Sequence, residues 1–525
     1  MTKSNTHLIE VKNDQSLTRY NLIYDRIAIN QLRSRENDAL IFVNLRRKIM
    51  SFNKNDFSAC TSILAGKNAT LDGSTIIARN EDSKSAWPKH MQIHAHKEYA
   101  ETQEFVSPDN GFKIKLPQIR AKYSATPEWT DKFGIFEEDG INEYGVAMSA
   151  TESAYANERV LGFDPLVKDG ISEEAMLTVV LPYIHTAREG VKRLGQLIEK
   201  YGTSESNGIL FTDSTEVWYL ETGSGHQWVA QRIPDDSYAV VANQLAIQEI
   251  DFSRPDDFMY ATNIQEFVTE NHLNPHADGF NFRNIFGTHD LSDEIYSTPR
   301  VWYGQKIFNP EIKQEPMNQE LPFIRKADRL LGLDDFKYVL GSHFQNTPYD
   351  PLGFGTEDQK HKFRPISLAK TQESHILQIR PDLPKEIAGI HWLAMGVTAQ
   401  SVFIPTYAGA TDVHPAYKVG KQKYSKDSAY WTYKLVGVLV DGHYTELQNL
   451  LKDAQKDTTI TLSNMLHESD QTAKTLSGEK LVKYLTEQNI KMQQLGLDKM
   501  EQLISELVTA STDLSVLNFN TDANL

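Results

Sequence analysis

Cysteine is almost absent from this sequence, whose 525 residues include one, Cys60. One thiol cannot form an intrachain disulfide. Zinc sites built on cysteines and CxxC redox pairs each need at least two thiols. Long chains without disulfides are typical of reducing compartments, so we expect a cytoplasmic location.

Long apolar runs and an excess of positive charge are missing too. No stretch approaches the roughly 18 consecutive apolar residues of a membrane span. The chain has 54 Lys and Arg against 70 Asp and Glu, a formal net charge of −16, whereas a dedicated nucleic-acid binder would carry a basic stripe. We therefore expect neither a membrane nor a nucleic acid as a partner.

The charge is uneven along the chain. Residues 1–59 carry a net charge of +4, and the remaining 466 residues carry −20. The longest apolar run of this leader, residues 39–43, is too short for the core of a signal peptide. We interpret residues 60–525 as one domain.

Three origins of the leader stay open. It is a pro-segment removed on maturation, an exposed extension, or a gene-calling artefact upstream of a true start at Met50. The third origin is suggested by Arg46, Arg47 and Lys48, because a purine-rich ribosome-binding site translated in this frame would spell such residues.

Short strands come in adjacent groups. Residues 61–66 and 75–79 alternate weakly around Asp72-Gly73, a strong hairpin signal. Further strands are predicted at 145–150, 208–212, 217–221, 228–233, 238–243 and 391–404. Grouped strands with helices between them favour an antiparallel-rich α+β sandwich.

Helices are predicted in three places. One starts at the capping box of Thr186 and ends at Gly202, and a second runs from Asp256 to about His272. Residues 300–385 contain several prolines and read as largely irregular. The part from about 440 to 515 reads as helical, and its apolar stripe faces the core or a second subunit, which leaves a homo-oligomer open.

Cys60 opens the predicted hairpin, and charged residues close it. A lone cysteine is by default a small buried apolar residue. An antiparallel hairpin brings its first and last residues side by side, so we expect Arg79 and Asp82 near Cys60. A nearby cation favours the reactive thiolate, and Arg79 can supply it; the alternative is a surface ion pair of little worth.

A cut between Ala59 and Cys60 would add a base to this arrangement. Cys60 would gain an α-amine, whose ordinary pKa of about 7.7–8.0 lets it accept a proton near neutral pH. An N-terminal amine activates an adjacent threonine nucleophile in the same way. Asp82 would then orient the amine by a hydrogen bond.

Residues 60–67 and 72–82 closely resemble the start of the mature chain in the dipeptidase A family. These enzymes are cysteine dipeptidases among the N-terminal-nucleophile hydrolases, with penicillin V acylase, bile salt hydrolase and the secernins as distant relatives. The resemblance covers nearly everything from Cys60 onward, including residues 147–153, 181–185, 228–236, 298–305, 349–353 and 363–367.

The resemblance implies a four-layer αββα sandwich of two antiparallel sheets, without a metal or cofactor. It also implies roles for individual residues. Cys60 matches the nucleophile, and Arg79 and Asp82 match residues that hold the catalytic centre. Asn243 resembles the oxyanion-hole asparagine of the acylases, and Arg300 resembles a second active-site arginine.

One departure from the acylases concerns the substrate. Where they place another asparagine, this chain has Thr151-Glu152. A carboxylate is a poor oxyanion donor but suits an ammonium group, which a dipeptide has and penicillin lacks. We predict that Glu152 binds this group; the alternative is an exposed strand-end glutamate.

The resulting hypothesis is a cysteine dipeptidase that works through a thioester intermediate after removal of the leader. An N-acyl amide hydrolase with the same mechanism and a non-catalytic, secernin-like interaction protein are the alternatives. His94 and His96 would share one face of a strand as a metal pair, but they lack a clear third ligand. The sequence does not reveal which dipeptides are preferred.

Overall fold

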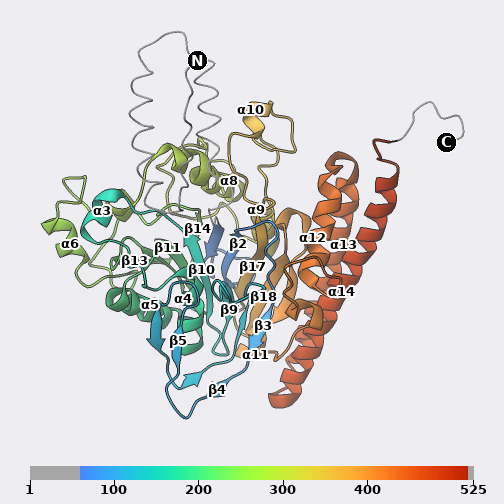
Figure 1. Ribbon diagram of the computed structural model, residues 1–525, viewed down its shortest axis with the longest axis horizontal. Helices are drawn as coiled ribbons and strands as arrows, with labels where there is room; N and C mark the ends of the chain where they lie inside the picture. Colours follow the sequence, from blue (N-terminus) through green and yellow to red (C-terminus); the bar gives the residue numbers. More distant parts are fainter. Residues whose placement is uncertain (1–59, 518–525) are drawn as a thin grey trace, which may run out of the picture. The chain divides into compact units, whose positions relative to one another are not determined.

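The computed structural model describes residues 60–517. The predicted leader, residues 1–59, lies outside the described residues, as do residues 518–525. The described part is an α+β fold built on two large antiparallel sheets (Figure 1).

The first sheet has seven strands and contains the predicted hairpin. Its order is β16-β14-β1-β2-β17-β18-β19, and all neighbours pair antiparallel. The strands are β1 (Thr61–Ala65), β2 (Thr75–Asp82), β14 (Tyr238–Val241), β16 (Ile324–Arg325), β17 (Thr371–Ile379), β18 (Gly389–Met395) and β19 (Ile404–Tyr407).

The second sheet has six antiparallel strands in the order β15-β13-β12-β11-β10-β9. They are β9 (Asp139–Ile141), β10 (Ala147–Ser153), β11 (Asn207–Thr212), β12 (Val217–Thr222), β13 (Trp228–Ile233) and β15 (Phe258–Tyr260). Three two-stranded ribbons precede or adjoin it: β3 (Gln92–His94) with β8 (Tyr123–Ala125), β4 (Lys97–Glu98) with β7 (Ile119–Arg120), and β5 (Glu104–Val106) with β6 (Lys113–Lys115).

Helices cover the outer face of each sheet, which gives the four layers (Figure 1). Against the second sheet lie α4 (Glu173–Val180) and α5 (Ala187–Tyr201). Against the first lie α8 (Thr298–Phe308), α9 (Leu333–Leu340), α12 (Ala429–Asp441), α13 (Tyr444–Ala473) and α14 (Gly478–Thr512). The shorter helices are α3 (Glu158–Phe163), α6 (Ile264–Glu270), α7 (Phe282–Phe286), α10 (Glu357–Lys360) and α11 (Lys385–Ala388).

Strand periodicity divides the apolar core into two parts. Along β2, Ile77 belongs to the cluster between the sheets, whereas Ile76 and Ala78 belong to the cluster under α12–α14. Successive side chains of a strand point to opposite faces. Both faces of β2 are buried, so its sequence is nearly continuously apolar up to Arg79.

Helix α5 has the predicted ends. Thr186 Oγ1 accepts a hydrogen bond from the Glu189 backbone N–H at 3.1 Å, as an N-cap side chain does. At the other end Gly202 has a φ of 74°, a left-handed value that glycine adopts without strain.

One local prediction is wrong, and another is incomplete. The helix expected from Asp256 begins only at Ile264, because residues 258–260 form the edge strand β15 beside β13. Much of 300–385 is irregular, as expected, but the stretch also contains α8, α9 and the central strand β17. Pairing with β2 and β18 stabilises β17, and such long-range pairing leaves little trace in local sequence.

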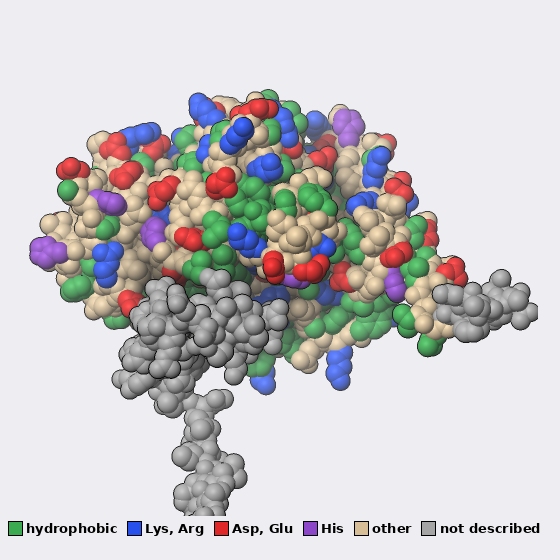
Figure 2. Space-filling model, turned by 90° about the horizontal axis from the view of Figure 1, so that it is seen from above, with side chains coloured by type: hydrophobic (Ala, Val, Ile, Leu, Met, Phe, Trp, Pro, Cys, Tyr) green, Lys and Arg blue, Asp and Glu red, His purple; other side chains and the backbone are tan. Residues whose placement is uncertain are grey.

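The surface mixes charges of both signs. Figure 2 shows acidic and basic side chains interspersed over one face, with apolar side chains between them. Across the described residues, every helix is too short or too polar to cross a membrane.

Candidate active site

Cys60 directly precedes β1 and is completely buried. In the two ladders of β1, Ser62 faces Arg79 of β2 on one side and Val241 of β14 on the other. Continuing both registers by two residues puts Cys60 between Glu81 and Asn243. The sheet itself therefore brings these residues to the thiol.

The Arg79 guanidinium lies against the thiol. Its Nη1 donates to Cys60 Sγ at 3.0 Å and also to the Glu81 carboxylate. Nη2 donates to Glu138 Oε2 at 2.5 Å, and Nε donates to Ser149 Oγ at 3.0 Å. Burial alone would lower the pKa of Arg79, but Cys60 and the surrounding carboxylates outweigh burial and raise it, so the guanidinium keeps its charge.

Three glutamates surround this guanidinium. Glu81 Oε2 accepts a hydrogen bond from Cys60 Sγ at 3.4 Å. Glu138 Oε1 lies 3.5 Å from Lys89 Nζ, and Glu173 Oε1 lies 3.9 Å from Arg79 Nη1. Thiol and carboxylates thus converge on one cation.

The three carboxyl groups differ in their protonation. Burial, followed by the Glu138 charge, raises the pKa of Glu81 to about 8. The same two causes raise the pKa of Glu173 well above its ordinary value. Burial acts on Glu138 too, but Lys89 and Arg79 outweigh it and lower the pKa of Glu138. Glu138 is therefore the carboxylate that keeps its charge.

Arg300 of α8 connects Cys60 with Asn243. Its Nη1 donates to the Cys60 carbonyl oxygen and, at 3.0 Å, to Thr61 Oγ1. Its Nη2 donates to Asn243 Oδ1 at 2.7 Å. Asn243 Nδ2 in turn donates to the Ser153 carbonyl oxygen at 2.8 Å. The amide is thus held in a defined orientation next to Cys60.

Asp82 lies on the other face of β2. It accepts hydrogen bonds from Arg364 and from the Thr371 hydroxyl, whereas Arg79 and Glu81 share the face of Cys60. The alternation of a strand separates residues 79 and 81 from residue 82. The predicted role of Asp82 toward an α-amine of Cys60 stays a prediction.

A chain of buried polar contacts continues from Arg79 between the sheets. Ser149 Oγ lies 2.9 Å from His375 Nε2, and His375 Nδ1 lies 2.9 Å from Asp139 Oδ2 and 3.0 Å from Glu373 Oε1. Burial would lower the pKa of His375, but the two carboxylates outweigh it and raise it to about 9. A protonated imidazole cannot act as a base, so this Ser-His-Asp order is not a catalytic triad.

Glu152 belongs to β10, where its backbone pairs with Gly208 beyond a register shift after Ser149. Its side chain lies outside the described part of the molecule. The predicted contact with a substrate ammonium therefore stays a prediction.

Metal ligation has two geometric candidates among the described residues. Glu81, Glu138 and Glu173 form one group, and Asp139, Glu373 and His375 form the other, each with ligand atoms within 4.8 Å of one another. Positive charge already lies against both groups, from Arg79 and Lys89 in the first and from the protonated His375 in the second, and it would repel a metal ion. The two histidines singled out in the sequence pair separately, His94 with Glu137 and His96 with Glu143, each at 2.6 Å.

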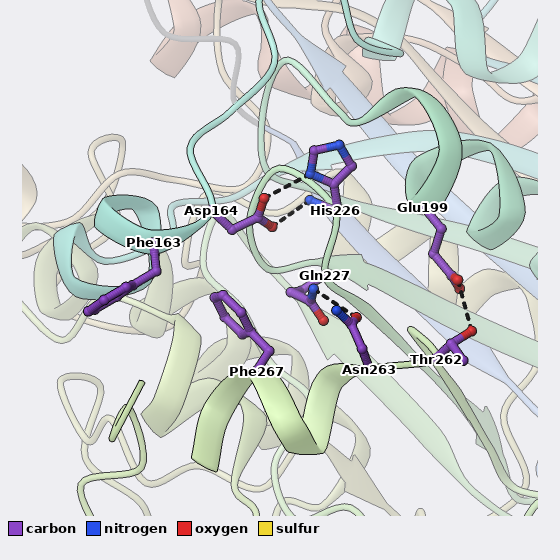
Figure 3. Close-up of a pocket in the computed structure, with 8 residues that line it drawn as sticks. All are labelled: Phe163, Asp164, Glu199, His226, Gln227, Thr262, Asn263 and Phe267. Carbon is purple, nitrogen blue, oxygen red and sulfur yellow. Dashed lines mark hydrogen bonds and ion pairs between the residues drawn. The ribbon is translucent and has the colours of Figure 1, made fainter. Parts of the chain in front are cut away.

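A separate pocket of about 390 Å³ lies between the end of α3 and α6 (Figure 3). His226 Nδ1 lies 2.8 Å from Asp164 Oδ1 there, and Gln227 Nε2 donates to Asn263 Oδ1 at 3.1 Å. Thr262 Oγ1 donates to Glu199 Oε2 at 2.9 Å. These polar groups pair with one another, although Gln227 Oε1 receives no hydrogen bond from the described residues. The pocket lining contains none of the residues around Cys60.

Sequence reasoning missed the buried charges that complete the site. Glu81 stands inside the RNED string that drew attention to Arg79 and Asp82, and counting in steps of two would have placed it on the face of Cys60. Glu138 directly precedes β9, Glu173 begins α4 and His375 belongs to β17. No local sequence pattern indicates that these three residues meet.

Known proteins resemble the chain over most of its length. Residues 59–457 match the model of peptidase family C69. The chain is 46% identical to a probable dipeptidase of Latilactobacillus sakei over 473 residues, which cover 90% of this chain and 99% of that protein. It is 40% identical to the probable dipeptidase B of Lactococcus lactis and 38% identical to dipeptidase A of Lactobacillus helveticus, each over 88% of this chain and 98% of the relative.

Proposed function

Because the chain belongs to peptidase family C69, we propose that it is a cysteine dipeptidase with Cys60 as its nucleophile. Its relatives are named dipeptidases, and the substrate class follows from them. The observation that carries the proposal is the convergence of Arg79, Asn243 and Arg300 on Cys60, the one cysteine of the chain.

Removal of the residues before Cys60 is the first step of the proposed mechanism. It exposes an α-amine, whose ordinary pKa of about 7.7–8.0 suits a base near neutral pH. The amine takes the thiol proton, and Asp82 orients it. The Arg79 guanidinium, 3.0 Å from Sγ, stabilises the resulting thiolate.

The thiolate then attacks the scissile carbonyl carbon. Asn243 and backbone N–H groups stabilise the oxyanion of the tetrahedral intermediate. As the C–N bond breaks, the leaving amine takes a proton from the α-ammonium of Cys60, and the acyl group stays on Sγ as a thioester. The α-amine of Cys60 next takes a proton from water, whose oxygen attacks the thioester carbonyl. The acyl group leaves as the free N-terminal amino acid of the dipeptide, and the thiolate is restored.

Arg300 acts in this scheme as a positioning residue for Asn243. Arg300 binds Asn243 Oδ1 and the Ser153 carbonyl oxygen takes one Nδ2 hydrogen, so the proposed donor to the oxyanion is the second Nδ2 hydrogen. The sequence offers Glu152 for binding the substrate's ammonium group, and the experiments of the next subsection test this role against Glu173. The scheme needs no metal or cofactor.

The test combines the chemical state of the chain with its activity. Protein expressed from Met1 and from Met50 is purified, and its intact mass and N-terminal sequence are measured. We expect a mature chain that starts at Cys60 and hydrolyses dipeptides. An active chain that keeps Ala59 would overturn the α-amine mechanism, and faster hydrolysis of N-acyl amino acids than of dipeptides would favour an acylase instead.

The nucleophile is tested by replacing Cys60. Cys60→Ala should abolish hydrolysis while its thermal midpoint stays near that of the parent, because alanine fills most of the buried volume. Dipeptide hydrolysis by the purified variant would contradict the assignment of Cys60. If the parent protein is active and the folded Cys60→Ala variant is not, the chain is an enzyme and not a non-catalytic interaction protein.

A further inference from the structure

The cluster at Arg79 contains one carboxyl group more than it has cations. Glu81, Glu138 and Glu173 face two cations, Arg79 and Lys89. Burying a carboxylate without a counter-charge is costly, so such a group takes up a proton or binds a cation. The cluster is therefore prepared to accept one further positive charge.

Two buried oxygens of the cluster, Glu138 Oε1 and Glu173 Oε1, receive no hydrogen bond from the described residues. Glu138 Oε1 lies 3.5 Å from the Lys89 ammonium group, so Glu173 has the weaker partner. Glu81 accepts from Cys60 and Arg79, and Glu138 accepts from Arg79. Glu173 Oε1 is buried, receives no hydrogen bond from the part of the chain that the structure describes, and lies 3.9 Å from Arg79 Nη1. Since Glu173 is only 6% exposed, this orphaned oxygen calls for an explanation.

Neighbouring groups show the same deficit. Ser172 precedes Glu173, and Ser206 follows Glu205, whose carboxylate accepts from the Glu173 backbone N–H at 2.7 Å. The hydroxyl oxygens of both serines are buried without a hydrogen-bond partner among the described residues.

A divalent metal ion fits this place poorly. Arg79 Nη1 donates to Glu81 and lies 3.9 Å from Glu173, and Lys89 lies 3.5 Å from Glu138. A metal ion held by the three carboxylates would lie next to a guanidinium and an ammonium group, whose charges repel it. A single ammonium group carries half that charge and three N–H donors.

We infer that the carboxylate of Glu173 binds the α-ammonium group of the dipeptide substrate, and this inference rests on the proposed function. In a dipeptide the ammonium nitrogen lies about 2.5 Å from the scissile carbonyl carbon. That carbon must come within about 3–3.5 Å of the attacking sulfur. Cys60 Sγ and Glu173 Oε1 lie 3.0 and 3.9 Å from the same nitrogen, Arg79 Nη1, so one dipeptide can reach both.

This assignment makes Glu173 a specificity-determining residue. An N-acylated substrate offers Glu173 no counter-charge, so the carboxyl group keeps its proton, whereas an ammonium group favours the ionised carboxylate. A substrate with a free amine supplies the positive charge that the glutamate cluster lacks, and its carbonyl carbon then lies at Cys60 Sγ. Discrimination between the two substrates is thus the property to measure.

The experiment compares alanyl-alanine with N-acetyl-alanyl-alanine in wild type and Glu173→Gln. Glutamine keeps the shape and removes the charge. We expect the KM for alanyl-alanine to rise roughly 10- to 100-fold, in line with the loss of a hydrogen bond to a charged group. The preference for the free amine should fall by the same factor, and alkylation of Cys60 by iodoacetamide should keep its wild-type rate.

Glu174→Gln is the matched control on the same helix. Glu174 is also buried, but its carboxylate already accepts from Ser107 Oγ at 2.6 Å and from the Ile135 N–H at 3.1 Å. Its replacement should leave KM and discrimination at wild-type values. Should Glu173→Gln fail to fold, Glu173→Asp retains the charge at a greater distance and should raise KM by a smaller factor with discrimination preserved.

The outcomes separate this inference from the proposed function. Wild-type hydrolysis of alanyl-alanine together with unchanged KM and discrimination in Glu173→Gln, or unchanged KM in a folded Glu173→Asp, overturns the inference and leaves the dipeptidase intact. Loss of discrimination in Glu152→Gln but not in Glu173→Gln assigns the ammonium group to Glu152 instead. A mature wild type that hydrolyses no dipeptide overturns the proposed function, and the inference with it.

Discussion

The two faces of the first sheet are both buried along its central strands, yet they are built from different chemistry. The face toward α12–α14 is mainly aliphatic and aromatic, as at Ile376 and Trp392, with the Asp82–Arg364 ion pair at the end of β2. The face toward the second sheet begins apolar at Ile77 but ends in Arg79 and Glu81.

The two faces differ in the free-energy cost of burying their side chains. Apolar burial stabilises by roughly 25 cal/mol per Å² without requiring any partner. A buried ion pair often stabilises no more than apolar residues of the same volume, because desolvation offsets the attraction. The outer face therefore supplies stability, and the charged end of the inner face is retained for chemistry.

Removing the central cation should have the largest effect. Arg79→Met leaves Glu81 and Glu138 without their guanidinium partner. We expect a loss of kcat/KM of at least about 1,000-fold, because the thiolate loses its cation, and a loss of about 3–5 kcal/mol in unfolding free energy. Kinetics and urea unfolding measure the two quantities.

Arg380→Met is the matched control on the helical side. Arg380 forms an ion pair with Asp470 of α13 at 2.5 Å. Its loss should lower stability but leave kcat/KM per folded molecule unchanged. If Arg380→Met lowered kcat/KM as much as Arg79→Met, the two faces would not differ in the way we describe.

A smaller loss is expected from the oxyanion donor. Asn243→Ala should lower kcat by about 100- to 1,000-fold with little change in KM, as expected when one oxyanion donor is removed. Asn489→Ala offers the comparison, because Asn489 of α14 is equally buried and its amide bonds both backbone groups of Tyr407. It should reduce stability alone; equal losses of kcat would contradict the role of Asn243.

The apolar face should respond in stability alone. Leu485 of α14 is completely buried in the cluster against the first sheet. Leu485→Ala should lower the unfolding free energy by about 2–5 kcal/mol, measured by urea denaturation. Alkylation of Cys60 should keep its rate under native conditions, and a faster rate would show that the helical layer shields the thiol.

The smallest effect is a pH slope. The pKa of His375 is raised to about 9 by Asp139 and Glu373 against the effect of burial. Its contribution to stability is therefore fully present below the ordinary histidine pKa of about 6.5 and is lost as pH rises through about 9. The thermal midpoint should fall between pH 6.5 and 9.5, and less so in His375→Gln.

The other groups in this region sharpen that measurement. The pKa of Glu81 is raised to about 8, so its contribution to folding stability is also lost as pH rises, between about 4.5 and 8. The difference between wild type and His375→Gln above pH 8 isolates the histidine. Equal slopes in both proteins would show that the buried imidazole is not the titrating group.

Much of the fold could be predicted because its signals are local. The turn residues within 61–82 predict a hairpin. The N-cap and the terminal glycine predict the two ends of α5. β17 escaped prediction although it is central to the first sheet, because its nine residues include Gln372, Glu373, Ser374 and His375. A polar run of this kind becomes a strand only through its neighbours β2 and β18.

The candidate site was predicted unevenly for the same reason. Cys60, Arg79, Asn243 and Arg300 were singled out from the sequence, and the structure brings their side chains or backbone into contact. Asp82 and Glu152 keep roles that stay predictions. The cytoplasmic location, the leader's removal and a homo-oligomer also stay predictions.

The hairpin, the grouping of strands and helices, and the single thiol could be read from the sequence, because they depend on neighbours in the chain or on composition. Which charges lie around that thiol depends on how the two sheets pack. Glu173 from α4, Glu138 from the approach to β9 and His375 from β17 come together where two sheets pack. The protonation of these groups depends on that packing, since the cost of a buried charge depends on what lies within a few ångströms of it.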